Sequence, residues 1–246
     1  MKEIVEVKIG YDGLSVAHAK TGTPMNVSRK ELFLALAKDV PNPDGSDTLV
    51  ANPYQTWKDV NASLPAVKIE VLGPPPTSGT RDAFVELAME HGCKEFDFIK
   101  AMKKADKKAF KAVCHTVRED GAFVEAGEND NLIVQKLEAN PSAFGIFGFS
   151  FLDQNRDKVE GVAIEGVKPE FETISDGSYP VSRPLFFYVK KAHVGVIPGI
   201  KEYLAEFTST KSMGQEGYLA ERGLIPLPGD EYKGVADAVK NLAPMK

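Results

Sequence analysis

Residues 71–82 read VLGPPPTSGTRD: a short apolar run, a proline-rich loop, and a turn of small polar residues that opens a helix. The first amides of a helix have no intrahelical acceptor and carry partial positive charge, so a helix start is receptive to anions. Gly79 lets a ligand approach the backbone closely, and Arg81 can donate a forked pair of N–H groups to a tetrahedral oxyanion. Further hydroxyl donors come from Thr77, Ser78 and Thr80. The stretch therefore predicts an anion-binding loop.

The same residues also fit an ordinary helix N-cap without a ligand, because Ser and Thr precede helices in many proteins. They do not form a nucleotide-binding P-loop, since no Gly-Lys-Ser/Thr follows at the required spacing, and they do not form a Gly-x-Ser-x-Gly nucleophile elbow. A nucleophilic Ser78 would need a positioned base. The four histidines stand in no recognisable arrangement around it, and we expect each at the surface or at a helix end: His18, His91, His115 and His193. We therefore expect no catalytic residue.

Apolar runs and helical stripes alternate on both sides of this stretch. Short strands are expected at Glu3–Gly10, Leu14–Ala19, Val67–Leu72, Ala143–Phe149 and Leu185–Val189. Helices are expected after a Ser28–Glu31 capping box, from Asn129, and at Phe84–His91, Phe96–Met102, Lys107–Val113, Ile200–Phe207, Lys211–Glu221 and Tyr232–Leu242. A loop is expected at Pro41–Asn52. Strands that alternate with helices predict an α/β protein with mixed or parallel sheets.

The composition argues against several kinds of partner and cofactor. Acids outnumber bases by 35 to 30, so no nucleic-acid partner is expected. No apolar run reaches the roughly 20 residues that cross a bilayer. The lysine-rich faces of the helices at 96–113 are interpreted as solvated surface. Cys93 and Cys114 lack the close Cys or His spacing of a metal site, which leaves two buried thiols or a disulfide as alternatives. We expect neither a metal nor another cofactor.

Several segments resemble, in the expected order, the substrate-binding proteins of phosphate ABC transporters. Residues 73–87, GPPPTSGTRDAFVEL, resemble the second phosphate-binding loop of that family in its proline-containing version. Residues 3–13, EIVEVKIGYDG, resemble the crossover into the second lobe. Residues 127–137 (GENDNLIVQKL) and 143–149 (AFGIFGF) resemble the helix and the strand that follow the loop. Residues 179–190, YPVSRPLFFYVK, resemble the strand that returns to the first lobe.

The resemblance implies the periplasmic binding protein type II fold, in which two α/β lobes with mixed sheets close on a dehydrated phosphate. Residues 1–12 would then form the crossover strand and a remnant of lobe 1. Residues 13–180 would form lobe 2, with the anion-binding loop at 73–82. Residues 181–246 would form the C-terminal part of lobe 1.

By the same resemblance, the protein would bind inorganic phosphate in the cleft between the lobes and deliver it to the permease subunits of an ABC transporter, without catalysis. Ser78, Gly79 and Thr80, together with Thr77, would donate backbone and hydroxyl hydrogen bonds, and Arg81 would supply the charged contact. Other members place an arginine and an aspartate before the Ser-Gly-Thr, where this chain has prolines, so Arg81 is the candidate replacement.

A second segment is a candidate for the same cleft. Asn129, Asp130 and Asn131 would close it, or would serve as an ordinary N-cap of the helix that follows.

Family members also begin with a strand and a Ser/Thr-rich loop that contribute the first half of the phosphate contacts, and nothing before Glu3 resembles them. We therefore expect an incomplete first lobe whose uncovered surface promotes self-association. The resemblance implies a periplasmic location, with the leader outside this chain, and it favours a disulfide between Cys93 and Cys114. The alternative function is a truncated lobe with weak or no phosphate binding that acts as an interaction or structural fragment.

Overall fold

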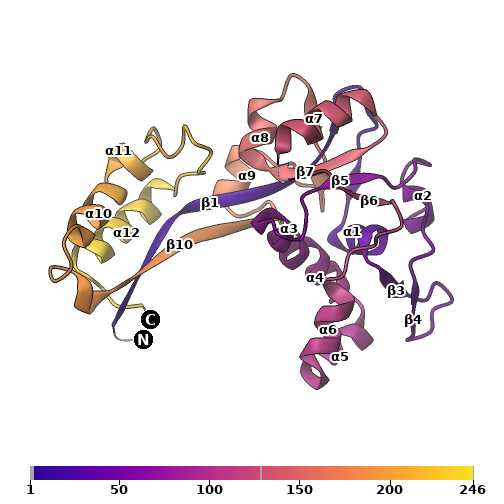
Figure 1. Ribbon diagram of the computed structural model, residues 1–246, viewed down its shortest axis with the longest axis horizontal. Helices are drawn as coiled ribbons and strands as arrows, with labels where there is room; N and C mark the ends of the chain where they lie inside the picture. Colours follow the sequence, from indigo (N-terminus) through magenta and orange to yellow (C-terminus); the bar gives the residue numbers. More distant parts are fainter. Residues whose placement is uncertain (1–2, 128, 246) are drawn as a thin grey trace. The chain divides into compact units, whose positions relative to one another are not determined.

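The computed structural model describes residues 3–127 and 129–245 and divides the chain into two compact units (Figure 1). Unit 1 comprises Met1–Gly13 and Glu170–Lys246, and unit 2 comprises Leu14–Pro169. The strand β1 (Ile4–Ala19) contributes its first part to unit 1 and its second part to unit 2. Each unit is an α/β structure, as the alternation of strand and helix patterns predicts.

The units divide at 13/14 and 169/170, whereas the expected boundaries are 12/13 and 180/181. The second boundary differs because the helix α9 (Phe171–Ser175) belongs to unit 1. Ile174 is fully buried against the backbone of Gly13, where a Cβ atom would collide with its side chain. The Ser175 hydroxyl also donates to the Pro226 carbonyl at 3.5 Å. Both contacts tie α9 to unit 1, the first to its N-terminal stretch and the second to its C-terminal stretch.

The sheet of unit 2 has a parallel centre and an antiparallel side. The strand β5 (Val71–Gly73) pairs in parallel with β6 (Phe123–Glu125) on one edge and with β7 (Phe144–Gly148) on the other. The second part of β1 pairs antiparallel with β7 and with β8 (Val159–Gly161). Every residue of β5 is buried, as is usual for a central parallel strand covered on both faces. The expected mixed sheet is confirmed.

Helices cover both faces of this sheet. In the view of Figure 1, α7 (Asp130–Ala139) and α8 (Phe149–Gln154) lie above the strands, while α1 (Arg29–Leu36), α3 (Gly79–Phe84) and α4 (Glu90–Cys93) lie below. A π-helical turn at Val85–Met89 joins α3 to α4 without interruption. The helices α5 (Asp97–Ala105) and α6 (Lys107–Cys114) form a hairpin that follows α4.

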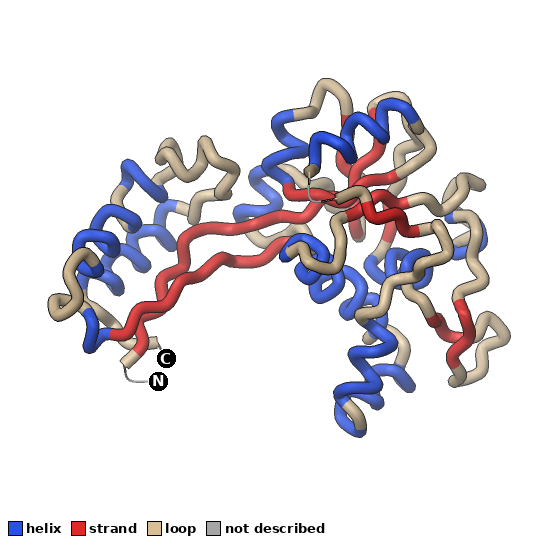
Figure 2. Tube along the Cα trace, viewed as in Figure 1, coloured by secondary structure: helices blue, strands red, loops and turns tan. Residues whose placement is uncertain are grey.

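Local signals in the sequence explain several of these elements. The expected capping box starts α1: the Ser28 hydroxyl accepts from the Glu31 amide at 3.1 Å, and the Glu31 carboxylate accepts from the Ser28 amide at 2.6 Å. The segment expected as a loop at 41–52 instead belongs to a small hairpin of β3 (Asp39–Pro41) and β4 (Leu49–Ala51), drawn as strands in Figure 2. Three short elements complete unit 2: α2 (Trp57–Val60), β2 (Asn26–Val27) and β9 (Ala163–Ile164).

Unit 1 is a two-stranded ribbon covered by helices. The first part of β1 pairs antiparallel with β10 (Ser182–Lys190). The helices α10 (Ile200–Phe207) and α12 (Gly229–Lys240) contribute Leu204 and Val239 to a core with residues of β1. The helix expected at 211–221 is reduced to α11 (Thr210–Met213), because Gly214 adopts an extended conformation at its C-terminus.

Two expectations about the N-terminal region are wrong. The two strands expected at Glu3–Gly10 and Leu14–Ala19 are one continuous strand, which absorbs an irregularity in its pairing between Lys8 and Gly10. His18, expected at the surface, is 1% exposed. Its Nδ1 atom lies 2.7 Å from the Ala19 carbonyl oxygen and its ring packs edge-on against Phe144. Its burial follows from the second part of β1 lying inside unit 2.

Candidate anion-binding site

The parallel strands of unit 2 bring several helix starts to one edge of the sheet. Gly73, Glu125 and Gly148 end β5, β6 and β7, and the parallel pairing places these ends at the same edge. The neighbours β5 and β6 lead into α3 and α7, which lie on opposite faces (Figure 1). Ligands of open α/β sheets bind outside the carboxyl ends of strands at such a switch point.

The start of α3 is capped in part. The Ser78 hydroxyl accepts from the Thr80 amide at 3.2 Å, and the Ser78 amide donates to the Pro75 carbonyl at 3.0 Å. The Gly79 amide, the first of the helix, has no acceptor within the described ranges 3–127 and 129–245. A Cβ atom at Gly79 would meet no atom within 4 Å, so this backbone is open to an approaching group. The start of α3 therefore has both an N-cap, Ser78, and a backbone amide, that of Gly79, which is able to donate a hydrogen bond to a ligand.

Arg81 is directed back toward the sheet. Its Nη1 atom donates to the Pro74 carbonyl at 3.1 Å, and its guanidinium carbon lies 4.2 Å from the centre of the Phe123 ring. Burial lowers the pKa of Arg81, whereas the negative charges of Glu125, Asp82 and Glu119 raise it. The half-buried guanidinium thus links the proline loop to β6. The carboxylates of Glu125, Asp82 and Glu119 also act on it electrostatically.

The helix α7 begins at the same edge. The Asn129 side chain accepts from the Asn131 amide at 3.0 Å, so Asn129 is its N-cap. Asp130 is half-buried, and burial raises the pKa of its carboxyl group. Asn129 and Asn131 are exposed, as is Thr77 at the end of the proline loop. Glu128, in the same motif, lies outside the described residues. The fold thus brings both predicted segments, 77–81 and 129–131, to one edge of one sheet.

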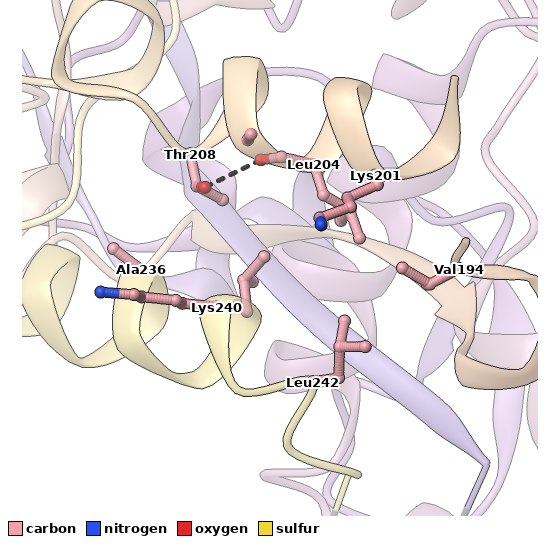
Figure 3. Close-up of a pocket in the computed structure, with 9 residues that line it drawn as sticks. Val194, Lys201, Leu204, Thr208, Ala236, Lys240 and Leu242 are labelled. Atoms are coloured by element: carbon pink, nitrogen blue, oxygen red, sulfur yellow. Dashed lines mark hydrogen bonds between the residues drawn. The ribbon is translucent and has the colours of Figure 1, made fainter. Parts of the chain in front are cut away.

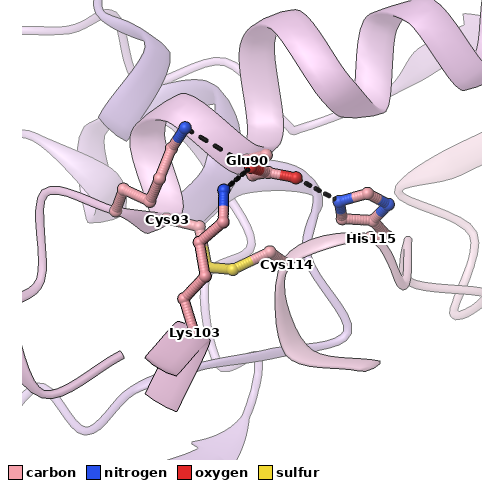
Figure 4. The surroundings of a disulfide bond; sticks show 6 residues. Glu90, Cys93, Lys103, Cys114 and His115 are labelled. Carbon is pink, nitrogen blue, oxygen red and sulfur yellow. Dashed lines mark hydrogen bonds and ion pairs between the residues drawn. A yellow bond between two sulfur atoms is a disulfide. The ribbon is translucent and has the colours of Figure 1, made fainter. Parts of the chain in front are cut away.

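A disulfide joins the far end of the helix that starts at the loop to α6 (Figure 4). Cys93 and Cys114 are both fully buried, and their Cα atoms are 5.6 Å apart. The bond closes the α5–α6 hairpin at its base. It therefore fixes the continuous helix of α3, the π-helical turn and α4 at the end opposite Gly79.

Glu90 forms a charged cluster beside the disulfide, which sequence reasoning did not find. Its carboxylate accepts from Lys103 at 2.9 Å and lies 2.7 Å from His115 Nε2 and 3.4 Å from Lys94 Nζ (Figure 4). Burial alone would raise the pKa of Glu90, but the hydrogen bonds from Lys103 and His115, together with the charges of Lys103 and Lys94, lower it to about 2. Only the i,i+4 spacing to Lys94 is visible in the sequence.

The described part of the chain also lacks features of metal-binding proteins and of proteins with membrane-spanning helices. Within it, no group of three or more His, Cys, Asp or Glu side chains is placed to hold a metal ion. No helix in it has the length and apolar character to span a membrane.

Two α/β units that share the strand β1 place the chain in the class of two-unit α/β proteins. A family model described as the PBP superfamily domain matches residues 1–211, and the chain belongs to this superfamily. The expected fold, periplasmic binding protein type II, is confirmed.

Several proteins that are similar to this chain are named as phosphate-binding proteins. The chain is 32% identical to the phosphate-binding protein PstS of Staphylococcus haemolyticus over 96% of its own length and 61% of that protein. For PstS of Staphylococcus saprophyticus the identity is 27%, over 94% and 62% of the two chains. The chain therefore spans about three fifths of the length of these curated relatives.

Solved structures show the same fold. A possible phosphate binding protein from Planctomyces limnophilus matches with a TM-score of 0.67 at 24% identity, covering 98% of this chain and 73% of that one. PstS from Borrelia burgdorferi matches with a TM-score of 0.60 at 19% identity, covering 92% and 74%. At these identities the likeness concerns the fold alone.

Proposed function

We propose that the protein binds inorganic phosphate at the start of α3, through Thr77, Ser78, Gly79, Thr80 and Arg81. The observation that carries this proposal is the open Gly79 amide at the positive end of a long helix, at the switch point of the sheet. The names of the relatives, which are phosphate-binding proteins, support the choice of anion.

The chemistry of this site relies mainly on neutral donors. The protein has a net charge of −5, and Glu125 and Asp82 act on Arg81 electrostatically, so the wider field disfavours an anion. Amides and hydroxyls that converge on a desolvated phosphate offset this field, because each hydrogen bond to a charged group contributes more than a neutral one. Arg81 has one N–H engaged by Pro74 and further N–H groups for a ligand. Asn129, Asp130 and Asn131 would add contacts from α7.

We further propose that the protein delivers phosphate to the permease subunits of an ABC transporter and is not an enzyme. The relatives named PstS support this role. A periplasmic location fits the Cys93–Cys114 disulfide, because disulfides persist in oxidising compartments.

A second candidate function is an interaction module with weak or no phosphate binding. It is favoured by the exposed large apolar side chains of unit 1, which include Phe186, Tyr188, Val196, Ile197 and Tyr203. Self-association through this surface is part of the same candidate function.

A thermal titration separates the two functions. A ligand that binds the native state raises the unfolding temperature as its concentration rises. We expect sodium phosphate to raise the unfolding temperature saturably, whereas sodium chloride at matched ionic strength leaves it nearly unchanged. No difference between the salts up to millimolar phosphate would favour the interaction module.

A further inference from the structure

A pocket in unit 1 takes no part in the proposed phosphate site. It lies between α10 and α12 and has a volume of about 340 Å³ (Figure 3). This volume is at the lower end of the range for small-molecule sites, about 300–1,000 Å³. Its lining is mostly apolar: Val194, Leu204, Ala205, Ala236, Val239 and Leu242.

The pocket is built on the packed hydrophobic core of the unit. Leu204 and Val239 are 3% and 4% exposed and pack with Val5 and Val7 of β1. The hydroxyl of Thr208, which also lines the pocket, donates its hydrogen to the Leu204 carbonyl at 2.8 Å. A hydroxyl has one hydrogen, so Thr208 offers a ligand no donor in this arrangement. The wall therefore favours a hydrocarbon.

Two cations flank this apolar wall. Lys201 of α10 reaches toward the space between the helices and Lys240 runs along α12 (Figure 3). Within the described part of the chain, neither ammonium forms a salt bridge, although acids outnumber bases in the protein as a whole. Both charged groups of the pocket thus have the same sign and remain available.

We propose that this pocket binds a small anionic amphiphile. Its alkyl chain lies against the apolar side chains of α10 and α12, and its anionic head group is met by Lys201 and Lys240. A medium-chain carboxylate has this chemistry. The pocket combines unpaired ammonium groups with an apolar wall, which fits a ligand that has both an anionic group and an alkyl chain. An uncharged helix of a partner protein would offer no negative charge to the lysines.

Calorimetry and amide NMR spectra with alkyl carboxylates, below their micellar concentrations, test the proposal. Decanoate is expected to bind saturably and to shift the amides of residues 194–208 and 236–242. Two methylene groups fewer, in octanoate, are expected to weaken binding about fifteenfold if both are buried. Decyltrimethylammonium, with the same chain and the opposite charge, is expected to bind at least tenfold more weakly than decanoate. Equal affinity for the two head groups would overturn the proposal.

Variants separate the head-group contact from the apolar wall. Replacing both lysines, Lys201→Gln with Lys240→Gln, is expected to weaken decanoate binding at least tenfold. Lys233→Gln, the same charge change at an exposed position of α12 outside the pocket lining, is expected to leave it unchanged. Ala236→Phe is expected to abolish binding by filling the space.

Three further results would overturn the proposal. The first is unchanged affinity in the double lysine variant, which alters only exposed side chains and so remains informative if Ala236→Phe misfolds. The second is the absence of saturable decanoate binding. The third is a shift of the same amides with protein concentration alone, which would identify a second copy as the occupant.

Discussion

The guanidinium carbon of Arg81 lies 4.2 Å from the centre of the Phe123 ring. This contact joins the first turn of α3 to β6, the strand that neighbours β5 in the sheet. An arginine stacked on an aromatic face keeps the N–H groups at its edge for hydrogen bonds. In the proposed phosphate site, Arg81 is therefore held in place before a ligand arrives, which lowers the entropic cost of binding.

Removing this guanidinium should weaken phosphate binding. We expect Arg81→Gln to raise the dissociation constant for phosphate about tenfold or more, because a hydrogen bond to a charged group contributes about 1.5–3 kcal/mol. The loss of the contacts with Phe123 and Pro74 should also lower the free energy of unfolding by about 1–2 kcal/mol. Titration calorimetry measures the first effect and urea unfolding the second.

Lys103→Gln is the matched control for Arg81→Gln. It removes a cation from the same unit that is bound to Glu90 and is remote from the proposed contacts. Its phosphate affinity should equal that of the unmodified protein. Comparable losses in the two variants would count against a specific role of Arg81.

The disulfide should contribute substantially to stability. A bridge between residues 21 apart in the sequence reduces the entropy of the unfolded chain, which corresponds to about 3 kcal/mol for a loop of this length. We expect Cys93→Ala combined with Cys114→Ala to lower the free energy of unfolding by about this amount. Dithiothreitol should lower the unfolding temperature of the unmodified protein and leave that of the double variant unchanged; equal responses would refute the assignment.

Glu90 should make stability depend on acid pH. Burial acts to raise the pKa of Glu90, but the hydrogen bonds from Lys103 and His115, together with the charges of Lys103 and Lys94, lower it from 4.5 to about 2. Because the folded-state pKa is the lower one, the stabilisation is fully present above pH 4.5 and is lost as the pH falls toward about 2. Glu90→Gln should flatten the pH dependence of the unfolding free energy in this window, whereas Glu86→Gln, at an exposed position, should preserve it. Identical slopes in the two variants would contradict this assignment.

Much of the fold follows from local patterns in the sequence. The capping box at Ser28–Glu31 and the N-cap at Asn129 occur where the residue types predict them, since both depend on side chains within three residues. The run Val71–Gly73 becomes a fully buried parallel strand. The proline loop and Gly79 follow that strand directly and therefore lie at its carboxyl end. The start of the helix depends on neighbouring residues, so the local sequence predicts it.

Long-range features could not be found in this way. The Glu90–His115 contact joins residues 25 apart, and the stacking of Arg81 on Phe123 depends on which strand lies beside β5. The expected strand at 67–72 loses its first residues because Val67 and Ile69 bond to Trp57 and Gln55 instead of the sheet. These outcomes depend on contacts between segments that are far apart in the sequence. Hydrophobic periodicity describes only the local pattern within one segment and does not predict such contacts.

The exposed aromatic pair of unit 1 provides a test of self-association. Phe186 and Tyr188 stack at 6.3 Å between ring centres and are 38% and 55% exposed. If this surface mediates self-association, Phe186→Ser with Tyr188→Ser should shift a concentration-dependent species to monomer in sedimentation velocity. Tyr218→Ser, a change at another exposed aromatic residue, should have no effect. A protein that is monomeric at all concentrations would contradict the proposal.

The Gly79 amide can be removed without disturbing the helix. Proline is well tolerated at the first position of a helix, where its missing N–H has no intrahelical partner. Ser78 has φ −85° and ψ 133°, the extended conformation that a residue before proline adopts. Gly79→Pro should therefore leave the unfolding temperature unchanged or slightly higher, while Gly79→Ala keeps the amide and serves as the matched control.

Calorimetric titration of phosphate into the unmodified protein and these two variants tests the central claim most directly. We expect saturable binding to the unmodified protein, nearly the same dissociation constant for Gly79→Ala, and at least a tenfold higher one for Gly79→Pro. If Gly79→Pro is folded and binds phosphate as tightly as the unmodified protein, the start of α3 is not the phosphate site.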